Sequence, residues 1–245
     1  MKRLLFALAL LAAPSVMAAK AGQDWLAPAG RDGADVALDE FRKPMETLTF
    51  FGLKKGAKVL DFGAGGGYYS VLMARIVGAK GSVVALTPAG SVASVKTKAK
   101  WTTLLAANPN VRQVIQPWDS FPAAQGSYSF VLFHLEYHDL YWESARFGVP
   151  KTNPDAVLKR LFGALKPGSI VGVVDHMGKS GDTRAIVDAT HRIDPEVVKA
   201  DFARAGFKLV GESQHLRDKS DDYSKNVFDT SRRNHTDRFV LKFKR

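Results

Sequence analysis

The stretch VLDFGAGGGYYS, from Val59 to Ser70, decides the fold of this 245-residue chain. Its first residues form a short apolar strand that ends in a carboxylate, and four glycines follow within five positions, where the backbone must turn sharply and approach a ligand. Apolar side chains then recur at helical spacing from Tyr69 to Ile76. We therefore expect a strand, a glycine turn and a helix whose free amides and positive dipole end face a ligand crevice.

The spacing of these glycines excludes two common nucleotide sites. The dinucleotide fingerprint G-x-G-x-x-G requires a glycine where Tyr68 stands, and the P-loop requires a Gly-Lys-Ser/Thr sequence that does not follow. The remaining pattern, two apolar residues and then Asp-x-Gly-x-Gly-x-Gly over Asp61–Gly67, resembles the first motif of the class I S-adenosylmethionine-dependent methyltransferases. In that family the turn passes under the amino acid part of the cofactor. The alternative is an ordinary strand-to-helix turn that needs flexible glycines.

The resemblance implies that S-adenosylmethionine is the cofactor. It places the cofactor-binding residues on the glycine turn, at the ends of strands and in the loop after the third strand. These residues are Asp61, Gly63, Ala64, Gly65, Gly67, Thr87, Trp118, Asp119 and His134. In the loop, Asp119 can accept a hydrogen bond from the adenine amino group while Trp118 or Phe121 stacks on the ring. A loop aspartate beside aromatic packing is the alternative.

One position departs from the family pattern. Most members have an acid at the end of the second strand, here Ser82–Leu86, which accepts hydrogen bonds from both ribose hydroxyls. Thr87 or a near neighbour stands there in this chain. A threonine makes one such bond without a charge, and a hydrogen bond to a charged group is worth roughly 1.5 to 3 kcal/mol.

The segment HLEYHDLYW, from His134 to Trp142, carries the densest chemistry of the chain. It follows the expected strand Ser127–Phe133, so it faces the same crevice as the glycine turn. A histidine can act as a general base near neutral pH, and methyl transfer otherwise needs mainly alignment of the reacting atoms. The candidate catalytic residues are His134, Glu136 and His138, together with Asp175 and His176 at the end of the strand Ile170–Val174.

Two other interpretations of this segment stay open. Its residues can simply line or brace the pocket. Alternatively, His134, Glu136 and His138 can be metal ligands, although their spacing is not that of H-E-x-x-H and they would converge only on an extended loop or on one helical face. We assign no metal site from the sequence.

The rest of the chain alternates strands and helices, which predicts a Rossmann-like doubly wound α/β sheet of about seven strands. Helices are expected over 35–51, split by Pro44, and over 91–107, 154–165 and 195–205, and Met177–Ala189 is expected to be a mobile lid. The strands 207–210 and 239–243 resemble the closing hairpin of the methyltransferase sheet, which implies a mostly parallel sheet with an antiparallel last strand.

The N-terminus has the pattern of a secretory signal. Lys2 and Arg3 precede an apolar run over 4–13, and small residues end the segment at Ala18. We expect cleavage after Ala18, a leader segment over 19–34 and one domain over 35–245. The alternative, an uncleaved anchor, needs roughly 20 apolar residues, about twice the run present. The chain is thus expected to be exported, and periplasmic in a Gram-negative source. It has no cysteine, which excludes disulfides and a cysteine nucleophile.

The formal net charge is +11, but no nucleic-acid-binding motif accompanies the basic residues. We expect no nucleic-acid partner and at most a weak electrostatic attraction to a membrane surface. The sequence does not indicate an oligomeric state. The substrate is expected to be a small molecule or an envelope component.

Resemblance to the methyltransferases extends from Asp35 to Arg245. The segments HRIDPEVVKADFARAGFKLVGES and TDRFVLKFKR are similar to a group of predicted exported bacterial methyltransferases. The first functional hypothesis is therefore an S-adenosylmethionine-dependent methyltransferase. The second is a non-catalytic ligand-binding protein with the same fold, and the third is a metal-dependent hydrolase that uses the histidine-rich segment.

Overall fold

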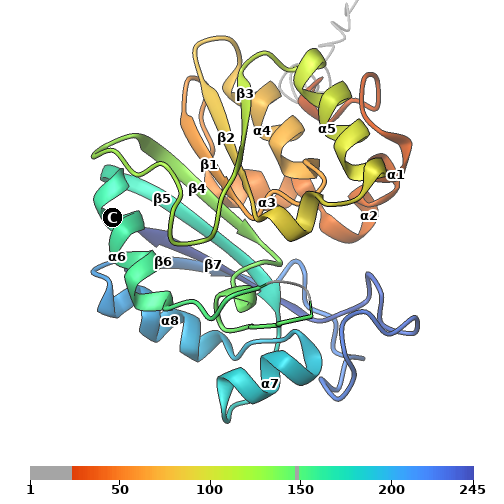
Figure 1. The fold of residues 1–245 in the computed structure, drawn as a ribbon, viewed down its shortest axis with the longest axis vertical. Coiled ribbons are helices and arrows are strands. Elements are labelled where there is room, and N and C mark those ends of the chain that lie inside the picture. The colour runs from red at the N-terminus through yellow and green to blue at the C-terminus, as the bar shows by residue number, and fades with distance from the viewer. Residues whose placement is uncertain (1–23, 147–148) are drawn as a thin grey trace, which may run out of the picture.

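Seven strands form one sheet in the order β3-β2-β1-β4-β5-β7-β6 (Figure 1). The computed structural model describes residues 24–146 and 149–245. Strands β1 to β5 pair in parallel, and β7 is antiparallel to both of its neighbours, which confirms the predicted sheet. The strands are β1 Lys58–Phe62, β2 Ser82–Thr87, β3 Val111–Ile115, β4 Tyr128–His134, β5 Leu165–His176, β6 Lys208–Ser213 and β7 Arg238–Lys244.

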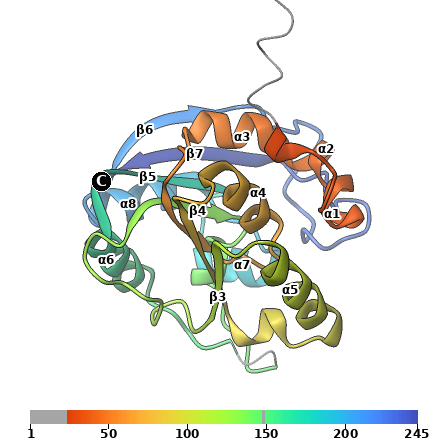
Figure 2. The ribbon, with the colours of Figure 1, turned by 90° about the horizontal axis from the view of Figure 1, so that it is seen from above.

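Helices cover both faces of the sheet (Figure 2). One buried cluster joins the sheet to α3, α4 and α5, and a second joins the opposite face to α6, α7 and α8. Side chains of β1 alternate between these clusters, because neighbouring residues of a strand point to opposite faces. The helices are α1 Gly33–Ala37, α2 Asp39–Arg42, α3 Pro44–Phe51, α4 Tyr68–Val77, α5 Val95–Ala107, α6 Pro154–Ala164, α7 Thr183–Thr190 and α8 Pro195–Arg204, with 3-10 turns η1 Asp24–Leu26, η2 Ala89–Val92 and η3 His138–Leu140.

Local capping signals set several helix starts. Asn153 caps α6 by accepting hydrogen bonds from two backbone amides, and Pro154 occupies the first turn, where its missing N–H costs nothing. Asp194 and Pro195 do the same for α8. Pro44 begins α3 after a left-handed residue, which confirms that it splits the N-terminal helical region.

Three predicted boundaries were wrong. The helix expected from Ser91 begins at Val95, because Ser94 supplies the cap, and a 3-10 turn precedes it. The strand expected from Ile170 begins at Leu165, where α6 has already ended. The segment over 177–189, expected to be a mobile lid, instead contains most of α7. Asp182 caps that helix, and the side chain of Val187 within the helix is buried.

The predicted signal peptide, residues 1–18, lies outside the described residues, so its cleavage stays a prediction. The described part of the leader packs against α4. The guanidinium of Arg75 donates hydrogen bonds to the backbone carbonyls of Trp25, Ala27 and Ala29, at 3.3, 2.8 and 2.6 Å. Over residues 24–146 and 149–245, no helix has the length and apolar character needed to cross a bilayer.

Candidate active site

The glycine turn between β1 and α4 leaves no room for side chains. Gly63 has φ +82°, and a Cβ atom there would lie 2.5 Å from Cγ of Glu136. Gly67, which caps α4, has φ +83°, and a Cβ atom there would lie 2.3 Å from Leu104. Both positions therefore need glycine for backbone conformation as well as for space.

A cavity of about 150 Å³ lies against this turn. The turn forms one wall, together with Asp61 at the end of β1. The N-terminal helices supply Asp35 and Arg42, and the end of β4 supplies His134, Leu135 and Glu136. The ends of neighbouring parallel strands thus meet at one crevice, as the sequence predicted.

Asp61 is a buried carboxylate at this cavity. It is 2% exposed, and one of its oxygens accepts a hydrogen bond of 2.6 Å from the Ser70 hydroxyl. Burial raises the pKa of Asp61 to about 7, because removal from water disfavours the charged form. Near neutral pH this side chain is therefore divided between its protonated and ionised forms.

His134 presents an unsatisfied nitrogen at the cavity. Its ring packs on Tyr69 with centroids 4.5 Å apart, and its buried Nε2 has no hydrogen-bond partner within residues 24–146 and 149–245. Burial, together with the positive charges of Arg42 and Arg238, holds the pKa of His134 well below its usual value. At neutral pH this imidazole is uncharged and can accept a hydrogen bond or a proton from a ligand.

Glu136 lies over the glycine turn and lines the cavity, and its side chain also interacts with that of Asp139, outside the cavity lining. Burial and the charge of Asp139 raise its pKa well above the usual range, and it shares a side-chain hydrogen bond with Asp139. The protonated form of this carboxyl group is thus favoured by its surroundings.

The remaining three predicted catalytic residues meet at the end of β5. Asp175 is fully buried and accepts hydrogen bonds from His138 Nδ1 at 2.8 Å and from the backbone amide of His176 at 2.7 Å. Burial opposes the charged form of His138, but Asp175 and Asp139 outweigh it and raise the pKa of His138 to about 9. The ring of His176 contacts the Thr236 hydroxyl at 2.7 Å, and burial holds its pKa well below the usual value. None of these three side chains lines the cavity.

Four predicted cofactor-binding residues also lie outside the cavity lining: Gly67 at the start of α4, and Thr87, Trp118 and Asp119. The hydroxyl of Thr87 is buried between the carbonyl of Val114 and the side chain of Gln113. Trp118 stacks on Phe62 inside the core, with centroids 5.2 Å apart. Asp119 is exposed and accepts a hydrogen bond from its neighbour Ser120. Their contribution to cofactor binding stays a prediction.

Sequence reasoning did not assign four side chains to the site. Asp35 and Arg42 reach the cavity from α1 and α2, in the region over 35–51 that the sequence predicted only as helical. Asp139 belongs to the histidine-rich segment but was not singled out. His191 lies just before the helix expected over 195–205, where it could brace the loop or reach the pocket, and the structure places its ring beside that of His138, with centroids 5.5 Å apart.

Known methyltransferases resemble this chain in part of the sequence and in the fold. The family model of protein-L-isoaspartate(D-aspartate) O-methyltransferase matches residues 41–110, which contain β1, the glycine turn, α4, β2 and α5. A S-adenosylmethionine-dependent methyltransferase from Aquifex aeolicus is similar in structure, with a TM-score of 0.58, 18% identity and coverage of 84% of this chain and 97% of that one. The chain has the class I methyltransferase fold.

Two further solved structures are similar to this chain in fold. Aeropyrum pernix fibrillarin, solved with natively bound S-adenosyl-L-methionine, matches with a TM-score of 0.51 and 12% identity over 84% of this chain and 76% of that one. The [4+2]-cyclase SpnF matches with a TM-score of 0.57 and 17% identity over 84% and 80%. None of the curated protein sequences compared with the chain matches it.

The residues of the cavity fit the amino acid end of S-adenosylmethionine. The turn has no side chains there, Asp61 offers a carboxylate to an ammonium group, and His134 offers an unsatisfied nitrogen. At the ribose end, β2 is followed by Pro88, Ala89 and Gly90, so no carboxylate follows the strand directly. The site therefore offers Asp61 and His134 to the amino acid end of the cofactor, but no carboxylate directly after β2 to its ribose end.

Proposed function

We propose that this protein is an S-adenosylmethionine-dependent methyltransferase acting on a small-molecule or cell-envelope acceptor in an exported compartment. The observation that carries the proposal is the cavity between the glycine turn, Asp61 and His134. The fold and the match over residues 41–110 support it further.

The glycine turn, Asp61 and His134 have different roles in this proposal. When bound, S-adenosylmethionine supplies an electrophilic methyl group on a sulfonium. The glycine turn admits the amino acid end, and Asp61 in its ionised form pairs with the ammonium. His134, whose Nε2 has no hydrogen-bond partner within the described residues, would accept the proton that an acceptor hydroxyl or amine loses when it takes up the methyl group.

Calorimetric titration of the purified chain with S-adenosylmethionine and with S-adenosylhomocysteine tests cofactor binding. We expect one site per chain, and Asp61→Ala should weaken binding by about tenfold or more, the equivalent of about 1.4 kcal/mol. Glu46→Ala, which removes an exposed carboxylate from α3, is the matched control and should bind normally. Absence of binding up to millimolar ligand would contradict the proposal.

A second candidate function is binding without methyl transfer. Two observations favour it: the Thr87 hydroxyl is already engaged by Val114 and Gln113, and the same fold occurs in a protein described as a cyclase. Release of S-adenosylhomocysteine during incubation with envelope extracts separates the two candidates. Tight cofactor binding without any such release would favour the second.

Export is proposed from residues 1–18 alone. The mature N-terminus, read by mass spectrometry of the protein from its own host, should be Ala19. A cytoplasmic protein that keeps residues 1–18 would refute export without affecting the proposed chemistry.

A further inference from the structure

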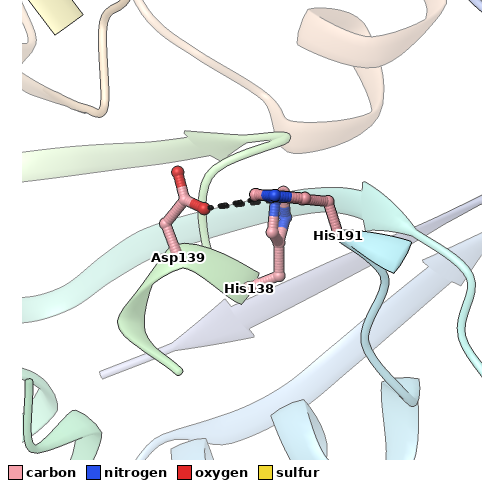
Figure 3. A group of neighbouring side chains, drawn as sticks. All are labelled: His138, Asp139 and His191. Atoms are coloured by element: carbon pink, nitrogen blue, oxygen red, sulfur yellow. Dashed lines mark ion pairs between the residues drawn. The ribbon is translucent and has the colours of Figure 1, made fainter. Parts of the chain in front are cut away.

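The side chains of two histidines and an aspartate, His138, His191 and Asp139, lie close together (Figure 3). His138 and Asp139 come from η3 after β4, and His191 comes from the C-terminal end of α7. One potential ligand atom from each lies within 4.8 Å of the others. Oδ1 of Asp139 is 3.3 Å from His138 Nε2 and 3.7 Å from His191 Nδ1.

A buried carboxylate orients the first histidine of this cluster. Asp175, fully buried, binds His138 at both Nδ1 and the backbone amide, at 2.8 and 2.9 Å. The imidazole is thereby fixed with Nε2 toward Asp139 and His191. Histidines that bind metals usually hold such a carboxylate on their other nitrogen, because it sets the tautomer and the direction of the ring.

The other two donors are also held in place. His191 adopts a left-handed backbone conformation, with φ +53°, which costs energy for a residue with a Cβ atom. Its ring packs edge-on against Trp142 and Phe228, with centroids 4.8 and 5.0 Å away. Asp139 Oδ1 is buried, and although both imidazoles lie at ion-pair distance it has no hydrogen bond of acceptable geometry within the described residues.

We propose that His138, Asp139 and His191 bind a divalent first-row transition-metal ion. Two imidazole nitrogens and one carboxylate oxygen suit Zn²⁺, Fe²⁺ or Mn²⁺, and three protein ligands leave positions open for water or a substrate oxygen. The site differs from the set His134, Glu136 and His138 considered from the sequence, because His134 faces the cavity instead. The inference goes beyond the proposed function and does not depend on it.

Direct metal titration tests the site. The full chain, purified without a histidine tag and stripped with a chelator, is titrated with ZnCl₂ and, separately, with MnCl₂ in a calorimeter. We expect one metal ion per chain. His191→Asn should lower the affinity by about 100-fold or more, while asparagine still tolerates the left-handed backbone. His235→Asn changes an exposed histidine outside the cluster and should keep the wild-type affinity.

A second variant keeps the test decisive if His191→Asn unfolds. Asp139→Asn preserves the shape of a partly exposed side chain and should also lower the affinity by about 100-fold, and thermal melts verify that both variants fold. Asp175→Asn, which acts only through the orientation of His138, should cost about 10- to 100-fold and alter the visible spectrum of the Co²⁺-loaded protein.

Two results would overturn the inference. One is no binding of either ion by the wild-type chain, which would mean that the cluster is an ion pair of His138 with two carboxylates. The other is binding that persists in folded His191→Asn and Asp139→Asn, which would place the metal elsewhere. Because the titrations contain no S-adenosylmethionine, neither result bears on the proposed methyl transfer.

Discussion

Replacement of Asp61 by asparagine should change how the stability of this protein depends on pH. The folded state raises the pKa of Asp61 from 3.8 to about 7, so between these values the folded chain holds a proton that the unfolded chain has released. Ionisation of Asp61 therefore destabilises the fold as the pH rises. A shift of roughly three pKa units corresponds to about 4 kcal/mol.

The Asp61→Asn variant is isosteric and its amide oxygen can still accept the Ser70 hydrogen bond. Its free energy of unfolding should match that of the wild type near pH 4, and exceed it by up to about 4 kcal/mol at pH 8. Urea unfolding curves at half-unit pH steps measure this difference. Glu46→Gln, an exposed change on α3, controls for the loss of one negative charge.

The same substitution has a second readout in cofactor affinity. The wild type should bind S-adenosylmethionine more tightly as the pH rises through 7, because only ionised Asp61 pairs with the ammonium, by up to tenfold per pH unit below 7. Asp61→Asn should bind weakly with little pH dependence over this range. Parallel stability curves for the two proteins between pH 4 and 8 would refute the burial argument.

Other substitutions test the glycine turn and the core. Gly63→Ala should destabilise the fold by about 1 to 3 kcal/mol and weaken cofactor binding, since its Cβ would lie 2.5 Å from Glu136; an unchanged melting temperature would contradict this close contact. Asp221→Ala should cost about 3 to 5 kcal/mol in urea unfolding, because it leaves the guanidinium of Arg192 buried without its carboxylate at 2.8 Å. Trp118→Ala should cost about 3 to 5 kcal/mol by removing a buried aromatic stack; normal stability with weaker cofactor binding would instead support the adenine role predicted from sequence.

Local signals in the sequence predicted most of the fold. The strand, glycine turn and helix after Val59 follow from apolar periodicity, and the starts of α6 and α8 follow from an Asn-Pro and an Asp-Pro pair. Helix α7 was missed because it is only eight residues long, polar on average and preceded by a glycine-rich stretch. Its stability depends on the Asp182 cap and on the burial of Val187 in the same core cluster as α6 and α8.

The candidate site was only partly predictable, because side-chain direction in loops depends on distant residues. His134 and Glu136 follow a parallel strand, so their place at the crevice could be expected. The approach of His191 to Asp139 depends on how α7 returns to the sheet, which no local pattern encodes. Trp118 stacks on Phe62 in the core. Whether its side chain lies in the core or in the pocket depends on tertiary packing, which local sequence does not encode.

The position of β7 in the sheet has a consequence for biosynthesis. Strand β7, the seven residues Arg238–Lys244, lies between β5 and β6, and every ladder contact of β6 is made to it. Strand β6, the edge strand beyond β7, therefore cannot join the sheet before β7 has been synthesised. Such late, long-range pairing slows folding.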